Sequence, residues 1–118
     1  GAFPYGARRA LRYGDGWIGI VHTIEETKSM IADLNAMRRE LGREKEPFDI
    51  MMHCPDATDV DNIRRLEDLG VTDLQVAPWT MPSVLAELGV SSMRVQPPLA
   101  IKQAAVKRYA DDVIAKCS

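Results

Sequence analysis

The sequence predicts an α/β fold in which helices cover parallel strands. Short apolar runs alternate along the chain with longer segments whose apolar residues recur at helical spacing. The strand-like runs are continuously apolar, which is typical of strands buried in a parallel sheet. The chain has 118 residues, of which 46% are hydrophobic and 27% are charged. One globular domain with a real core is therefore expected across residues 1–118.

The chain is expected to open with a short helix and a strand. Proline suits the first turn of a helix over residues 4–13, and Gly14 can end that helix in a left-handed conformation. The apolar run at residues 17–21 then predicts a buried strand.

A second helix and strand follow. Thr23 and Glu26 have the spacing of a capping box, which predicts a helix start, and Gly42 predicts its end. The run over residues 48–53 predicts the second strand.

The alternation continues in the second half. Thr58 or Asp59 caps a helix that ends at Gly70, and the third strand is expected over residues 74–77. A shorter helix is expected over residues 82–88.

The last predicted element is a helix over residues 99–115. One apolar face of this helix is formed by Ile101, Ala105, Tyr109 and Val113. Three strands are few for a parallel sheet, for which about five to six is typical. Either residues 90–95 hold a further strand, or the sheet continues in other chain or in a partner.

Residues 14–19 match the spacing GxGxxG of dinucleotide-binding folds. The binding fingerprint follows a strand and opens a helix, whereas here a helix precedes the glycines and a strand follows. The side chain of Trp17 also stands where phosphate would have to approach the backbone. We therefore interpret the segment as a turn from a helix into a strand.

Polar or aromatic side chains follow all three predicted strands. Because ligands bind at the carboxyl ends of parallel strands, these side chains are expected at one ligand-binding rim. His22 and Thr23 follow the first strand, and Asp56 lies a little beyond the second. The candidate ligand-binding residues are His53, Cys54 and Trp79.

Each candidate also has a structural interpretation. His53 either orients or protonates a ligand, or is a half-buried histidine bonded to a neighbouring carbonyl. Cys54 is better explained as a small buried side chain than as a nucleophile, because no base is assigned to it. Trp79 either stacks on a flat ring or packs in a core or interface. The histidines and Cys54 lack metal-ligand spacing, so that no metal is expected.

Charge and cysteine content are ordinary. The net charge is −2, which favours neither a nucleic-acid nor a membrane surface. The chain has 2 cysteines, too few for a disulfide framework, so that a cytoplasmic location is expected.

The N-terminal segment, residues 1–17, reads GAFPYGARRALRYGDGW and resembles the luciferase-like monooxygenase family. This family comprises flavin-dependent monooxygenases and deazaflavin (F420)-dependent oxidoreductases. Its most specific feature here is Gly-Asp-Gly-Trp between an Ala/Arg-rich helix and a strand. The resemblance continues through PFDI at residues 47–50 and LEDLGVTDLQVAPW at residues 66–79. It covers residues 1–79 and is looser beyond them.

The resemblance implies a (β/α)8 barrel, a fold that needs about 200 residues or more. This chain would then be a partial barrel of about the last three βα units, with parallel strands and covering helices in a three-layer α/β arrangement. The family's Gly-Gly strand end and the helix start after it lie near the cofactor phosphate. By that match Gly1 and Ala2 would contact the phosphate of FMN or F420, with Arg8 or Arg9 as a weaker candidate.

The resemblance further implies the C-terminal portion of an oxidoreductase or monooxygenase, with little or no activity alone. A partial barrel leaves open sheet edges and an uncovered inner face, so that a homo-oligomer is expected. The alternative is a stand-alone, non-catalytic α/β binding or assembly module. A receiver-like signalling domain is a weaker alternative, because Asp56 is the only acidic residue suitably near a strand end.

Overall fold

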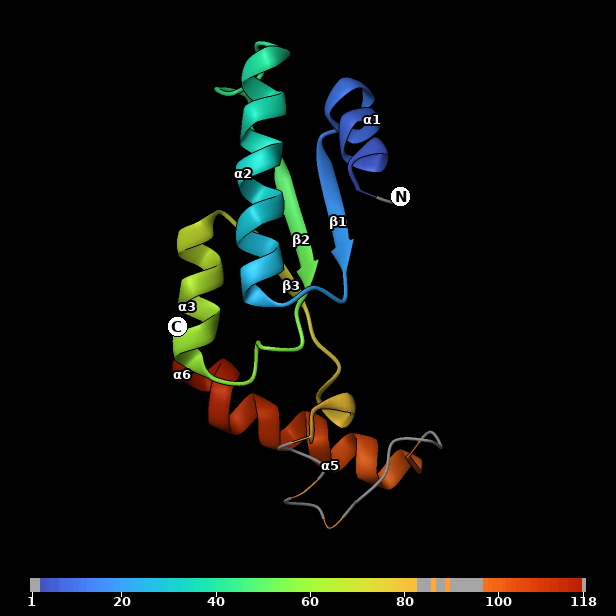
Figure 1. Cartoon of the computed structure of the whole chain (residues 1–118). Coiled ribbons are helices and arrows are strands. Elements are labelled where there is room, and N and C mark those ends of the chain that lie inside the picture. The colour runs from blue at the N-terminus through green and yellow to red at the C-terminus, as the bar shows by residue number, and fades with distance from the viewer. Residues whose placement is uncertain (1–2, 83–85, 87–88, 90–96, 118) are drawn as a thin grey trace.

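The computed structural model describes residues 3–82, 86, 89 and 97–117. In these residues, helices alternate with three parallel strands, so that the predicted α/β class is confirmed (Figure 1). The elements are α1 (Tyr5–Tyr13), β1 (Gly16–Ile20), α2 (Ile24–Glu40), β2 (Asp49–His53), α3 (Val60–Leu69), β3 (Asp73–Gln75), η1 (Pro78–Thr80), α5 (Leu99–Tyr109), the π-helical segment η2 (Ala110–Ile114) and α6 (Ala115–Cys117).

The strands lie in the order β1-β2-β3, and both neighbouring pairs are parallel. His53 is paired in register with Ile20 on one side and Gln75 on the other. These three residues therefore form the last row of the sheet, at the carboxyl ends of its strands.

One face of the sheet carries the main core. Trp17, Ile50 and Met52 are buried on it and pack with apolar residues of α1, α2 and α3. The side chains of Ile18 and Ile20 alternate to the other face and are 53% and 64% exposed. In the described residues this face of β1 is uncovered, so that the predicted three-layer arrangement is wrong there: helices α1 to α3 share a single face.

The start of α2 confirms the predicted capping box. The Glu26 amide donates to Thr23 Oγ1 at 3.2 Å, and the Thr23 amide donates to Glu26 Oε2 at 3.0 Å. At α3 the cap is Asp59 rather than Thr58, because Asp59 Oδ1 accepts the amide of Asn62 at 2.8 Å. The expected left-handed end of that helix is also present, with Gly70 at φ +107°.

The predicted left-handed end of α1 is wrong. Gly14 is extended, with φ −121° and ψ 175°. The guanidinium of Arg43, almost thirty residues further along the chain, donates to the carbonyls of Leu11 and Gly14. Because this side chain satisfies free carbonyls at the helix end, the backbone turns directly into β1 without a left-handed residue.

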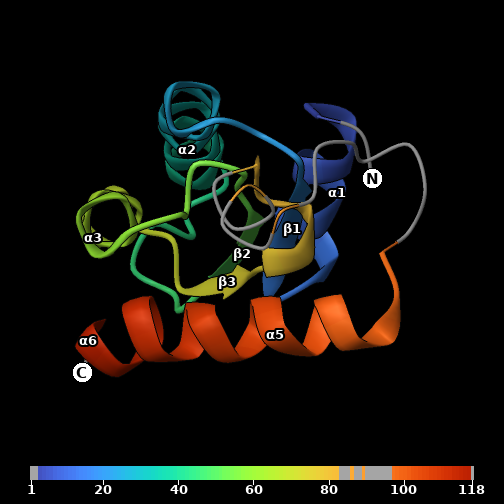
Figure 2. The same cartoon turned by 90° about the horizontal axis from the view of Figure 1, so that it is seen from below.

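The C-terminal helix crosses beyond the carboxyl ends of the strands (Figures 1 and 2). Tyr109 and Val113 are buried with Met81 in a second cluster, against Val60, Ile63 and Val76. Tyr109 Oη donates to the carbonyl of Ala57 at 2.7 Å and so links the helix to the β2–α3 loop.

Two predictions fall largely outside the described residues. These are the helix over residues 82–88 and a possible strand within residues 90–95.

Candidate functional site

A pocket of about 340 Å³ opens at the carboxyl-end rim of the sheet. Segments that follow β1, β2 and β3 all contribute to it, as the parallel topology predicts. Its lining is formed by Val21, His53, Cys54, Pro55, Thr80, Met81 and Pro82.

His53 is half-buried at the last position of β2. Its carbonyl accepts the amide of His22 at 3.2 Å, which extends the β1–β2 pairing beyond β1. Its imidazole ring, in contrast, has no hydrogen-bond partner among the described residues. The structural interpretation of His53 as a histidine bonded to a neighbouring carbonyl therefore finds no support in these residues, and the ring is free to bind a ligand.

Cys54 is 1% exposed and packs in the main core. Burial raises the pKa of its thiol, and the charges of Asp56 and Glu26 add to this rise. Backbone hydrogen bonds of Asp56 and Ala57 act in the opposite direction without reversing it. The thiol therefore stays protonated at neutral pH, which fits the predicted role of a buried side chain and not of a nucleophile.

The helix start beside the pocket is already occupied by carboxylates. Asp56 Oδ2 accepts the amide of Ile24 at 2.9 Å, and Glu26 closes the capping box on Thr23. His22 Nδ1 lies 3.5 Å from Glu26 Oε2, outside the pocket lining. Because carboxylates already bind the first amides of α2, this helix start is not an open anion site.

Trp79 does not line the pocket, although it follows β3 as expected. It is half-buried, and the Nζ of Lys102 on α5 lies 5.6 Å from its ring centroid. This contact is a cation–π interaction between η1 and the C-terminal helix. His53 and Cys54 therefore lie together in the pocket lining, whereas Trp79 packs against the C-terminal helix.

Sequence reasoning missed Val21 as a pocket residue. Val21 was expected inside the first strand, but its φ of +58° ends β1 one residue earlier and brings it to the pocket. Thr80 belongs to η1, and its hydroxyl donates to the Ala77 carbonyl at 2.7 Å. Pro78, at the first position of η1, was the only local signal for this turn.

The proposed phosphate-binding residues remain a prediction. Gly1 and Ala2 lie outside the described residues. Arg8 is exposed on α1, a helix of 9 residues that precedes β1. In the described ranges, no group of three or more His, Cys, Asp or Glu side chains is placed to hold a metal ion. The described helices also include none that is long and apolar enough to cross a membrane.

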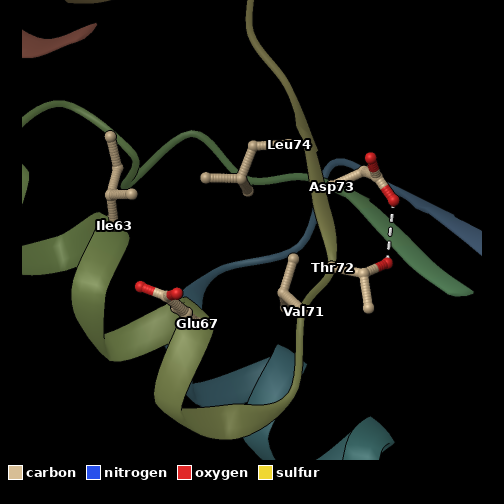
Figure 3. A pocket seen from close by; sticks show the side chains of 6 residues that line it. All are labelled: Ile63, Glu67, Val71, Thr72, Asp73 and Leu74. Atoms are coloured by element: carbon tan, nitrogen blue, oxygen red, sulfur yellow. Dashed lines mark hydrogen bonds between the residues drawn. The ribbon is translucent and has the colours of Figure 1, made fainter. Parts of the chain in front are cut away.

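A second hollow, of about 470 Å³, lies between α3 and β3 (Figure 3). Ile63 and Glu67 contribute from the helix, Val71 and Thr72 from the turn before β3, and Asp73 and Leu74 from the strand itself. Thr72 Oγ1 lies 2.8 Å from Asp73 Oδ2. The hollow lies beside the edge of β3 that has no paired strand in the described residues, and it does not share residues with the carboxyl-end rim.

Comparison with known proteins gives relatives but no family. No protein-family model matches the chain, and no solved structure matches it. Curated relatives include uncharacterised proteins of Mycobacterium bovis and of two Mycobacterium tuberculosis strains, each 36% identical over 112 residues, or 92% of this chain. The chain spans about a third of the length of these relatives, 34% in each case.

Proposed function

We propose that this chain is the C-terminal portion of a flavin- or F420-dependent luciferase-like oxidoreductase or monooxygenase. The observation that carries the proposal is the order of the elements: a helix, the Gly-Asp-Gly-Trp turn, and then three parallel strands separated by helices on one face. The last units of a (β/α)8 barrel have this arrangement, with helices outside and a second face turned to the barrel interior.

The uncovered face of β1 supports the partial-barrel interpretation. Ile18 and Ile20 are apolar side chains that a barrel interior would bury, and they are more than half exposed here. The longer curated relatives have room for the remaining barrel, since the matched segment is 34% of their length. A chain holding about three of eight units lacks most of the site, so that we expect little or no turnover from it alone.

The cofactor, FMN or F420, would supply the hydride or oxygen chemistry. The described residues suit the phosphate of such a cofactor only in part. Arg8 is an exposed cation and suits a phosphate. The pocket at the rim does not suit one, because its described lining residues include no lysine or arginine, and carboxylates lie beside it.

A reading-frame test separates the enzyme from the alternative. If the coding sequence continues upstream of Gly1 for about 150–200 further residues, enough chain exists for a whole barrel. A start codon immediately before the codon of Gly1 would contradict the enzyme proposal and support an independent module.

The alternative is a non-catalytic assembly module, and the exposed Ile18 and Ile20 favour it as well. A second copy of the chain could cover this apolar face and the unpaired edge of β1. Light scattering at micromolar concentration tests the association. The proposal predicts a dimer or larger species, and a monodisperse 13.1 kDa monomer contradicts it.

A further inference from the structure

We propose that the carboxyl-end pocket binds a small, uncharged and largely apolar molecule, which His53 anchors by a single hydrogen bond. The identification of this molecule as an enzyme substrate rests on the proposed function. The proposal that the molecule binds is independent of that function, because it is argued from the pocket alone.

The size and lining of the pocket set the kind of ligand. Its volume of about 340 Å³ lies at the lower end of the range for small-molecule sites, about 300–1,000 Å³. Such sites combine apolar walls with a few placed polar groups. The apolar walls here are Val21, Pro55, Met81 and Pro82.

His53 is the strongest hydrogen-bonding group left for a ligand. The described lining has two other polar side chains, but the Thr80 hydroxyl already donates to the Ala77 carbonyl, and a thiol such as that of Cys54 is a weak donor. The ring of His53 has no hydrogen-bond partner among the described residues, and its nitrogens are still reached by solvent. A ligand in the pocket can therefore replace water at this ring.

The surroundings of the pocket disfavour an anion. Burial raises the pKa of the Cys54 thiol, and the charges of Asp56 and Glu26 add to that rise, so that a negative charge at this position is unfavourable. Among the described residues, the lining has neither a cationic side chain to pair with an anion nor a carboxylate to pair with a cation. A neutral molecule is therefore the best match.

The backbone of Val21 gives an independent indication of a functional site. Its φ of +58° lies in the left-handed region, which is strained for a β-branched residue. Such strain is concentrated at ligand sites and active sites. Here it brings an apolar side chain to the pocket instead of continuing β1.

Acetophenone and benzoate are matched probes for this proposal, because both are small aromatic carbonyl compounds and only benzoate is charged. The chain has 2 histidines, so that the ring signals in a ¹H–¹³C NMR titration report the pocket and a control position together. We expect acetophenone to shift the His53 signal in a saturable way and to leave His22 unchanged. Benzoate is expected to bind at least tenfold more weakly.

Substitutions at His53 test whether its side chain makes the proposed hydrogen bond to the ligand. His53→Phe is expected to weaken acetophenone binding about tenfold, and His53→Gln, which keeps a hydrogen-bonding group, to weaken it less. His22→Phe is the matched control and should bind like the unaltered chain. Equal binding of benzoate, a shift confined to His22, or full affinity in His53→Phe would overturn the proposal.

Thiol labelling provides a readout that needs no variant. Cys54 is buried at the pocket and Cys117 is exposed at the C-terminus. Saturating acetophenone should slow alkylation of Cys54 by at least threefold and leave Cys117 unchanged, whereas equal effects on both contradict the proposal. If acetophenone binds this chain but neither FMN nor F420 binds the full-length Mycobacterium tuberculosis relative, the proposed ligand site is supported and the oxidoreductase proposal is contradicted.

Discussion

Tyr109 makes a side-chain hydrogen bond between the C-terminal helix and the sheet-bearing part of the chain. Its hydroxyl donates to Ala57, a fully buried residue whose carbonyl loses this donor in Tyr109→Phe. We expect the variant to lose about 1–2 kcal/mol of unfolding free energy at neutral pH, measured by urea titration. Tyr5→Phe, at an 81% exposed residue, is the control and should leave the stability unchanged.

The same tyrosine predicts an alkaline pH dependence. Burial raises the pKa of Tyr109 from 10.0 to about 12, so that folding favours the neutral phenol. Its stabilisation is complete below pH 10 and is lost as pH rises toward about 12, because the unfolded chain ionises first. Tyr109→Phe lacks this loss, and its stability deficit should shrink over that interval. A deficit that stays constant with pH contradicts this account.

At the scale of the element, the start of α2 depends on a local cap. Thr23→Ala removes the side-chain acceptor for the Glu26 amide. We expect a loss of about 1 kcal/mol in chemical denaturation. Ser29→Ala, at an exposed position inside the same helix, is the matched control. An equal effect in the two variants would show that the cap contributes nothing specific.

The start of β1 depends on a glycine. A Cβ at Gly16 would lie 2.8 Å from the backbone oxygen of Asp49 on the paired strand. Because a backbone atom cannot rotate away, Gly16→Ala should destabilise the fold by about 1–3 kcal/mol. Asp15→Ala, at the exposed neighbour, should change thermal stability little. A Gly16→Ala protein as stable as this control contradicts such a close approach of β1 to β2.

The elements also show which features local patterns can predict. The capping box of Thr23 and Glu26 lies within four residues, and it was predicted correctly. The end of α1 was not, because Arg43 satisfies its carbonyls from a distant part of the chain. The π-helical turn at residues 110–114 was also missed: apolar residues at a constant spacing of four drift around an α-helix, and the wider turn keeps Val113 beside Tyr109.

In the candidate site too, local sequence patterns predicted some residues, whereas others depend on the backbone or on distant parts of the chain. His53 and Cys54 were predicted at the rim, because strand ends are readable from apolar runs. Val21 was not, because a strained backbone brings it there. Trp79 was placed at the rim by its position after β3, but Lys102, from the C-terminal helix, determines its contact.

At the scale of the whole molecule, the uncovered face of β1 predicts association. Ile18→Lys combined with Ile20→Lys places two charges on that face, and we expect this variant to be monomeric where the unaltered chain associates. Val106→Lys, at a 45% exposed residue of α5, is the control and should still associate. Sedimentation velocity distinguishes these results, and association that survives in the double variant places the interface elsewhere.

We have proposed that this chain supplies the last units of a flavin- or F420-dependent barrel. The most direct test is a fluorescence titration of FMN and of F420 against the full-length Mycobacterium tuberculosis relative, of which the matched segment is 34%. We expect one of the two cofactors to bind the relative at micromolar concentration or below, and this chain alone to bind it more weakly. If a folded, full-length relative binds neither cofactor, the proposed function is wrong.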